Sequence, residues 1–254
     1  MNLIDLVRIE LKKGKRSFIL PLIFVAPLLV ISSGIASLST YFTPEYTDAW
    51  AAMFIQSALV YAYYLLPFSM IVVCVMIASR EKQNNGILKM LVLPVDRKKI
   101  SLAKFLVLVT YLLLEIVVFF LVFIIAGTIA TRTTQVTEVL PIGYILKWCV
   151  QLFVTMLPAL AAMWAITCSF ERPAFSVGLN LFLVIPGVLI ANTPFWVIYP
   201  YCYSGYMVSC ALHDFTVDGN AITMEWNPFV PCAIMVFGSL LLLSLVKFGK
   251  KEMR

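Results

Sequence analysis

Charged residues are scarce in this chain, and their scarcity indicates its class. Only 13% of the 254 residues are charged, whereas 62% are hydrophobic. A soluble domain carries about 25% charged and about 45–50% apolar residues. The apolar residues also occur in runs that reach the length of about 20 residues needed to cross a bilayer as a helix. The composition therefore excludes a soluble domain and predicts an all-α polytopic membrane protein.

The residue patterns of common catalytic sites are also missing. The sequence has no Gly-x-x-x-x-Gly-Lys-Ser/Thr loop, so it binds no nucleotide through a P-loop. Its single histidine, His213, excludes a paired-histidine zinc site and is interpreted as a surface residue. No Ser/His/Asp arrangement is suggested within the apolar runs. We therefore predict that the chain is not an enzyme and has no catalytic residue, metal site or cofactor of its own.

The few cysteines do not form an evident disulfide framework. Four of the six lie in apolar runs and are interpreted as small buried hydrophobic residues, namely Cys74, Cys149, Cys168 and Cys232. Cys202 and Cys210 lie in a segment expected outside the membrane. If that segment is one helix, they are separated by about 12 Å, which is beyond disulfide reach. A turn at Ser204-Gly205 would instead permit a bridge, and both alternatives remain open.

Six apolar runs are predicted to span the membrane within a single domain of residues 1–254. Their approximate limits are 17–38, 54–78, 101–126, 144–168, 174–192 and 229–247. The first run exceeds the apolar core of about 7–15 residues in a signal peptide, so we expect it to be retained. Pro186-Gly187 lies in the middle of the fifth run and is the expected kink.

The basic residues are distributed unevenly across these spans. All but two of the 19 Lys and Arg residues fall on one side, and the exceptions are Arg132 and Lys147. Because cytoplasmic segments carry an excess of Lys and Arg, both termini are predicted to be cytoplasmic. The basic residues flank apolar runs and form no stripe with interleaved aromatic residues, so nucleic-acid binding is not expected.

Residues 1–16 are predicted to form an amphipathic helix at the membrane surface. Ile4, Val7 and Leu11 recur at helical spacing, while basic residues occupy the other side, namely Arg8, Lys12, Lys15 and Arg16. Such a helix lies in the interface and is held by anionic headgroups. The alternative is a basic leader that only sets the orientation of the first span.

The segments predicted outside are acidic and aromatic, and the longest covers residues 193–227. Their candidate substrate contacts are Glu45, Asp48, Trp196, Tyr199, Tyr203 and Tyr206. Carboxylates and aromatic rings would attract a cationic amphipathic peptide by charge and stacking. The alternative is an ordinary aromatic belt in the headgroup zone.

Glu115 is the single acidic residue well inside a predicted span. A carboxyl group in the membrane is costly and suggests a functional site, here a polar contact on a transport path or a proton-coupled group. The alternative is a protonated glutamate that is hydrogen-bonded between helices. Tyr111, one helical turn earlier, is the partner expected in that case.

A polar segment between the second and third spans, residues 80–99, carries a short amphipathic pattern. Ile87, Leu88 and Leu91 form one apolar edge, Gly86 permits a tight turn before it, and Pro94 ends it. Such a helix can present its edge to a groove on a soluble partner. The alternative is a loop whose apolar edge packs on the bilayer. We call residues 80–99 the coupling segment.

The same region carries a resemblance to a known family. Glu81-x-x-x-x-Gly86 precedes Ile87-Leu88-Lys89, and Leu91, Pro94-Val95, Arg97, Ile100 and Lys104 follow. This order after a second span resembles type 2 ABC export permeases. The small size is most similar to permeases of lantibiotic immunity and bacitracin resistance, which export antimicrobial peptides.

The resemblance implies partners and roles for several segments. Residues 81–94 would be a coupling helix that docks on an ABC ATPase subunit, which would bind the ATP and Mg²⁺. Residues 1–16 would be the connecting helix, and the segment after the fifth span would form outer re-entrant helices. Two permease copies or two related permeases would assemble with an ATPase dimer in a bacterial plasma membrane.

Two other function classes remain as alternatives. An ATP-independent secondary transporter or channel would use Glu115 or another polar group in the membrane to couple ions. A peptide-sensing membrane protein would bind peptide without net export.

Overall fold

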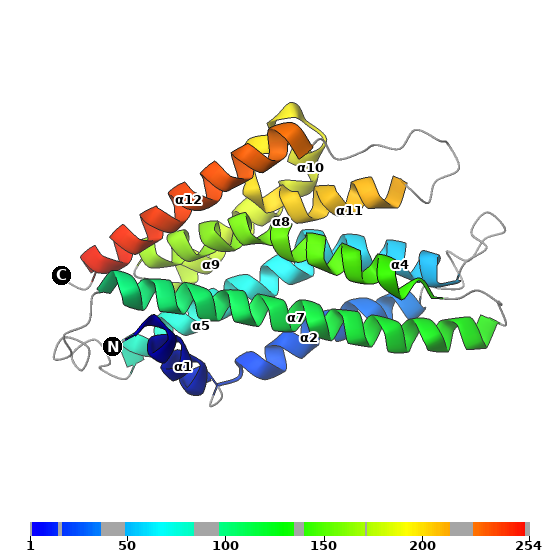
Figure 1. Ribbon diagram of the computed structural model, residues 1–254, viewed down its shortest axis with the longest axis horizontal. Coiled ribbons are helices and arrows are strands. Elements are labelled where there is room, and N and C mark those ends of the chain that lie inside the picture. The colour runs from blue at the N-terminus through cyan, green and yellow to red at the C-terminus, as the bar shows by residue number, and fades with distance from the viewer. Residues whose placement is uncertain are drawn as a thin grey trace.

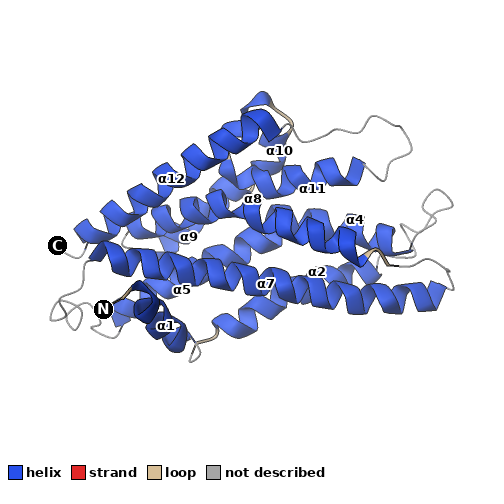
Figure 2. Cartoon of the chain, in the orientation of Figure 1, coloured by secondary structure: helices blue, strands red, loops and turns tan. Residues whose placement is uncertain are grey.

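The computed structural model describes residues 2–14, 17–36, 49–83, 97–134, 140–170, 172–213 and 226–251, and helix is the regular structure throughout them (Figure 2). Within these ranges, six helices are long and apolar enough to cross a membrane. They cover Ile19–Ala36, Ser57–Arg80, Arg97–Arg132, Ile142–Ser169, Pro173–Ala191 and Trp226–Phe248. The predicted all-α membrane protein with six spans is confirmed.

The described helices follow one another along the chain as an antiparallel bundle (Figure 1). The N-terminal half contains α1 (Leu3–Gly14), α2 (Ile19–Ala36), α4 (Ala49–Val60), the π-helix η1 (Tyr61–Leu65), α5 (Leu66–Gln83) and α7 (Arg97–Thr134). The C-terminal half contains α8 (Ile142–Ser169), α9 (Pro173–Val184), α10 (Gly187–Ala191), the short helices η2 (Pro194–Ile198) and η3 (Pro200–Cys202), α11 (Tyr203–His213) and α12 (Trp226–Lys251).

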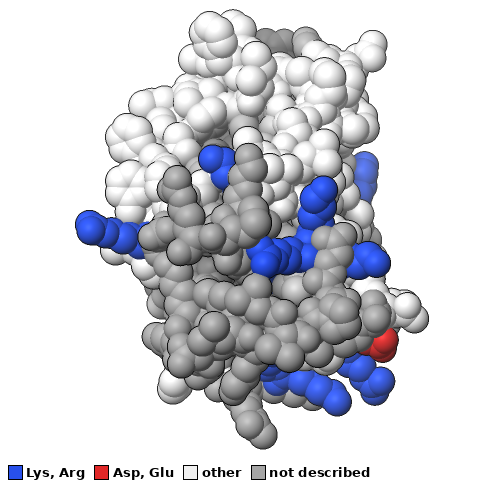
Figure 3. Space-filling model, turned by 90° about the vertical axis from the view of Figure 1, so that its left-hand side faces the viewer, with Lys and Arg blue, Asp and Glu red and all other residues white. Residues whose placement is uncertain are grey.

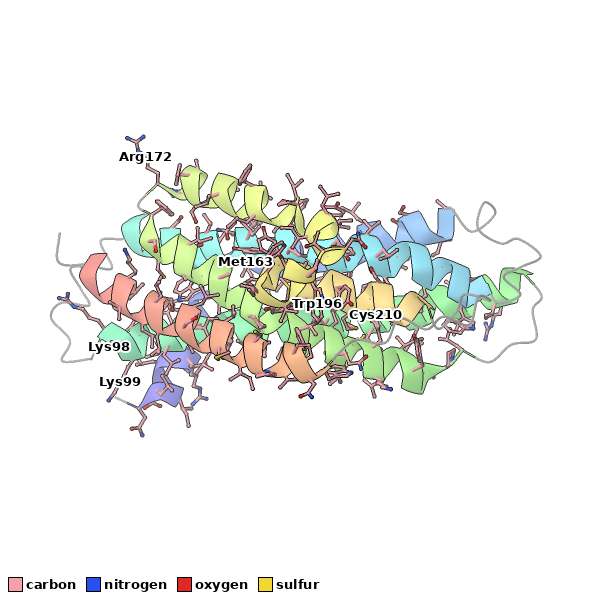
Figure 4. All side chains as sticks on the ribbon, turned by 90° about the horizontal axis from the view of Figure 1, so that it is seen from above. Lys98, Lys99, Met163, Arg172, Trp196 and Cys210 are labelled. Carbon is pink, nitrogen blue, oxygen red and sulfur yellow. The ribbon has the colours of Figure 1, made fainter. Side chains whose placement is uncertain are left out.

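Both chain ends lie at the same end of the bundle, on the left in Figure 1. Figure 3 looks onto this end and shows Lys and Arg side chains gathered on it. Lys98, Lys99 and Arg172 are among the basic residues there (Figure 4). Because cytoplasmic segments are enriched in Lys and Arg, we call this the inner end and the opposite one the outer end.

Helix α8 forms the centre of the bundle. In its most apolar window 67% of the residues are buried, against 11% for α12, which lies at the periphery. Trp148 and Trp164 of α8 are the largest fully buried side chains. Helices α5, α7, α11 and α12 all pack on α8. Large aromatic side chains on a central helix make many van der Waals contacts with the surrounding helices, and such packing drives helix association in a membrane.

Prolines explain where the spans depart from simple helices. The fifth span ends as α9 at Val184 and resumes as α10 at Gly187, with a turn at Ile185 and Pro186. Proline lacks the N–H that would continue the helical ladder. The kink expected at Pro186-Gly187 is therefore observed. By contrast, Pro158 stays inside α8, as spans tolerate when neighbouring groups compensate.

The second span contains a wider turn that the sequence pattern did not predict. The chain passes from α4 into η1 and α5 without leaving the helix, and the Leu66 N–H donates to the Tyr61 carbonyl, five residues back. Pro67, which follows directly, cannot donate to a carbonyl in the preceding turn. One missing donor favours local widening of the helix, and such π-turns occur frequently at functional sites.

Candidate functional site

The first and last residues of the coupling segment belong to two helices that reach the inner end of the bundle. Helix α5 ends at Gln83 and α7 begins at Arg97. The predicted ATPase contacts Gly86, Ile87, Leu88, Leu91 and Pro94 lie outside the described residues. Glu81 belongs to the last turn of α5. The docking role of these residues stays a prediction, and the described structure shows instead what the two flanking helices hold.

Helix α1 is held on α7 by charged side chains. Glu10 accepts from Lys104 Nζ at 3.3 Å and from Lys13 Nζ at 2.5 Å. The Lys104 side chain is only 1% exposed, and that of Glu10 is 12% exposed. Burial by itself raises the pKa of Glu10, but the charges and hydrogen bonds of Lys104 and Lys13 outweigh it, so the pKa is lowered. The carboxylate therefore stays ionised and keeps α1 attached to α7.

Two further contacts complete this attachment. A Cβ atom at Gly14 would lie 1.8 Å from the hydroxyl oxygen of Tyr111, so glycine permits the close approach of α1 to α7. Ser17, after α1, accepts a hydrogen bond from the Arg80 guanidinium of α5. Helix α1 is thereby joined to both helices that flank the coupling segment. We call Glu10, Gly14, Ser17, Arg80, Lys104 and Tyr111 the inner anchor.

The predicted amphipathic helix exists, but a different set of residues faces the protein. Val7 and Leu11 pack against the core as expected, whereas Ile4 is 80% exposed and Leu6 is buried in its place. A helix packed on α7 favours the connecting helix over a simple basic leader. Ile4, Ile9 and Phe18 remain exposed and are available to lipid.

Glu115 of α7 is fully buried where α7 faces α5. Ser69 Oγ lies 2.6 Å from Glu115 Oε1, and no ion pair with Glu115 occurs among the described residues. The expectation that Tyr111 is the hydrogen-bond partner of Glu115 is wrong, because the Tyr111 hydroxyl group faces Gly14 at the inner anchor. Residues four apart share a helix face, but here the neighbouring helix supplies the partner. A role for Glu115 in transport stays a prediction.

The end of the fifth span and the chain that follows it form a hairpin of α10, η2, η3 and α11, which we call the outer hairpin. Trp196 stacks on Tyr206 with ring centroids 4.3 Å apart, and Tyr203 meets Phe229 edge to face at 4.9 Å. The hydroxyl groups of Tyr203 and Tyr199 donate to the carbonyls of Val197 and Leu183, respectively. These contacts tie the hairpin to itself, to α9 and to α12.

The predicted substrate contacts of this hairpin are therefore mostly covered. Trp196 and Tyr203 are buried at 8% and 0% exposure, and Tyr199 and Tyr206 are partly buried. Their contact with a peptide stays a prediction that requires the hairpin to open. Glu45 and Asp48 lie outside the described residues.

The outer hairpin docks on the π-helix of the second span. Ser204 Oγ donates to the Ala62 carbonyl at 3.0 Å, and the hydroxyl groups of Tyr63 and Ser209 are 3.2 Å apart. A Cβ atom at Gly205 would lie 2.2 Å from the Tyr63 ring, so a glycine is required there. Helix α11 thus supplies a donor to a carbonyl in the widened turn. We call these residues the hairpin dock.

A polar network that the sequence pattern did not single out joins α9 to its neighbours. Asn180 is fully buried, accepts from the Tyr201 hydroxyl at 2.8 Å and donates to the Ser176 carbonyl at 2.8 Å. Ser176 Oγ lies 3.1 Å from Thr167 Oγ1 on α8. An asparagine within an apolar run was the available signal, because such a polar group needs an internal partner.

A family comparison identifies the kind of protein that carries these sites. The model of the ABC-2 family transporter protein matches residues 6–187 of the 254, which extend from α1 into α10 and include the inner anchor. The chain belongs to the ABC-2 transporter family. A comparison with curated proteins found no match.

Family membership identifies the chain as the membrane-spanning subunit of an ABC transporter. Its ATPase is a separate partner, and the chain is a multi-pass protein of the cell membrane. In this ABC-2 permease, the inner anchor lies on the two helices that flank the coupling segment, and the hairpin dock lies on η1 of the second span. The π-helix η1 connects the two through α5.

The cysteines of the permease form no bridge within the described residues. Neither Cys202 nor Cys210 forms a disulfide, and both are buried. Cys202 ends the short helix η3 and Cys210 belongs to α11, so the bridge is not formed although the segment is not one continuous α-helix. No cluster of three His, Cys, Asp or Glu side chains suited to a metal ion occurs in the part of the chain that the structure describes.

Proposed function

We propose that this ABC-2 permease exports amphipathic cationic peptides from the membrane, as part of an assembly of two permeases and two ATPase subunits. The observation that carries the ATP-driven step is the inner anchor. It joins α1 to α5 through Ser17 and Arg80 and to α7 through Glu10 and Lys104. A pull on the coupling segment would therefore move three helices together.

The second step of the proposed mechanism is transmission of this movement from the cytoplasmic side to the outer hairpin. Helix α5 continues into η1, and the Ala62 carbonyl of η1 binds Ser204 of α11. A shift of α5 at the inner end would change the position of the hairpin dock. Nucleotide binding to the ATPase drives such a change only if the ATPase binds one of the two permease conformations more tightly.

The substrate class is supported by the chemistry of the outer segments. Phe195 and Trp226 are 71% and 47% exposed beside the stacked rings of the hairpin. Opening of the hairpin would add Trp196, Tyr203 and Tyr206 to this aromatic surface. Aromatic rings bind Lys and Arg side chains as well as apolar ones, and Glu45 and Asp48 add negative charge. A cationic amphipathic peptide matches both properties.

The coupling role is tested by capture of the partner ATPase. Leu91→Asp and Glu81→Ala should both reduce co-purification of the ATPase, because they remove the apolar edge and the acidic residue of the predicted helix. Lys89→Gln serves as a control within the same segment. Undiminished capture by both variants contradicts docking at this segment.

The substrate is tested in cells and in vesicles. Cells without the permease should become more sensitive to lantibiotics or to bacitracin, and reconstituted complexes should move a labelled cationic peptide only with ATP. Unchanged sensitivity to all such peptides overturns the proposed substrate while leaving the ATP-driven mechanism intact.

The buried carboxyl of Glu115 supports a second candidate, an ion-coupled transporter. That function predicts transport into vesicles that contain no ATP and no ATPase, driven by a proton gradient and abolished by Glu115→Gln. Full ATP-driven transport by Glu115→Gln would exclude it.

A further inference from the structure

Three polar side chains that belong to three different helical segments come together inside the bundle. They are Glu115 of α7, Ser69 of α5 and Tyr61 at the start of η1, and their exposures are 0%, 5% and 0%. Tyr61 stacks on Phe119, one turn after Glu115, with ring centroids 4.3 Å apart.

The hydrogen bonds of this cluster leave two polar atoms without a partner. Ser69 Oγ lies 2.6 Å from Glu115 Oε1 and 2.9 Å from the Leu66 carbonyl. The other carboxyl oxygen, Oε2, and the hydroxyl group of Tyr61 have no hydrogen-bond partner among the described residues. A buried polar group without a partner is destabilising, so two of them in one cluster call for a ligand.

Hydrogen counting indicates the chemistry of that ligand. A carboxyl group buried in the membrane without a cation favours its neutral form, which has one O–H donor. The single hydroxyl proton of Ser69 can reach the Leu66 carbonyl while the Glu115 O–H donates to Ser69 Oγ. Oε2 is then a carbonyl oxygen that needs a donor, and the Tyr61 hydroxyl needs an acceptor.

We propose that Glu115 and Tyr61 form an internal site that holds at least one water molecule between α7 and η1. The water donates to Glu115 Oε2 and accepts from the Tyr61 hydroxyl, and a buried water of this kind makes about two to four such bonds. A water rather than a metal cation fits the site, because a neutral carboxyl and two hydroxyl groups provide no net negative charge.

The bound water would give η1 a contact with α7 that can be exchanged. A bridging water can leave or shift when η1 moves relative to α7, whereas a direct hydrogen bond would break. This role concerns the second and third spans, and it does not depend on which substrate the permease exports.

Infrared spectroscopy of the purified permease with its ATPase in lipid nanodiscs tests the site. The band of a neutral carboxyl group should disappear in Glu115→Gln and shift in Tyr61→Phe. An O–H stretching band of weakly bonded water, identified by its shift in H₂¹⁸O, should be lost in both variants. Tyr64→Phe is the matched control, because Tyr64 lies in the same π-helix and is only partly buried.

Ser69→Ala separates the water from the rest of the cluster. It should shift the carboxyl band, since Oε1 loses its partner, and keep the ¹⁸O-sensitive water band. The proposal is overturned if Glu115→Gln removes no neutral carboxyl band. It is also overturned if the water band is absent from the native protein or persists in Glu115→Gln, a measurement that stands even where Tyr61→Phe does not fold.

Discussion

The inner anchor and the hairpin dock solve the same problem with different chemistry. Both attach a peripheral helix to a membrane span, and both use a glycine to bring the helix close. The inner anchor then relies on the charges of Glu10 and Lys104, whereas the hairpin dock relies on Ser204, a backbone carbonyl and an aromatic ring. Charged side chains cost less free energy near the cytoplasmic interface, which is close to water and headgroups, than in the middle of the membrane.

The two attachments should therefore differ in how easily they are broken. A buried ion pair is costly to break, because the remaining charge stays in an apolar environment. A hydroxyl bond to a π-helix carbonyl is weaker and can be exchanged. The permease therefore has a firm attachment where force would enter and a looser one where the hairpin would open.

The largest expected effect comes from breaking the ion pair. Lys104→Met should lower the free energy of unfolding by about 3 kcal/mol, since it leaves the Glu10 carboxylate buried with only Lys13. Thermal unfolding in detergent measures this change, and Glu10→Gln in the same chain should restore most of it. Lys13→Met is the control, because Lys13 is 45% exposed and its pair contributes about 0–1 kcal/mol. Equal effects of the two lysine variants would contradict the inner anchor.

Overpacking the hairpin dock should have the next largest effect. Gly205→Ala places a methyl group within 2.4 Å of three atoms of the Tyr63 ring, and overpacking costs about 1–3 kcal/mol. Hydrogen exchange should show faster opening of α11, with α1 unchanged. In Gly238→Ala of α12 the new methyl group meets nothing within 4 Å, so this variant should unfold like the native protein. Unchanged exchange of α11 in Gly205→Ala would contradict the dock.

Removing the hydroxyl donor of the dock should have a smaller effect. Ser204→Ala leaves the Ala62 carbonyl of the wide turn without this donor, at a cost of about 1 kcal/mol. The same exchange measurement should show moderately faster opening of α11 and of η1. Ser239→Ala is the control, because the exposed Ser239 hydroxyl only donates to Val236 in its own helix. If both variants behave alike, Ser204 does not hold the hairpin.

Acid should weaken the inner anchor, with the smallest of these effects. Burial raises the pKa of Glu10, but Lys104 and Lys13 lower it by more, so the folded value lies below the unfolded one. The ion pair therefore stabilises the protein fully above the unfolded pKa, and this stability is lost as the pH falls through the folded pKa. Melting temperature should fall from about pH 5 to about pH 3 more steeply in the native protein than in Glu10→Gln. Parallel curves would show that Glu10 carries no linked proton.

Composition and local pattern were sufficient for the layout of the fold. Apolar runs located the six spans, although α7 extends to Thr134, well past the predicted limit at 126. Helices continue beyond the apolar run wherever the next residues are compatible with helix, so run length is a poor guide to their ends. Pro186 located the break in the fifth span because its missing N–H acts locally.

The class and the orientation could be read from the sequence alone, since hydrophobicity and charge are properties of neighbouring residues, whereas the role of the coupling segment stays a prediction. Only the tertiary structure decided the partners of the buried polar groups. Ser69 and Glu115 are 46 residues apart, Glu10 and Lys104 are 94 apart, and Ala62 and Ser204 are 142 apart. In a membrane every buried donor and acceptor must find an internal partner, but which one it finds depends on how the spans pack.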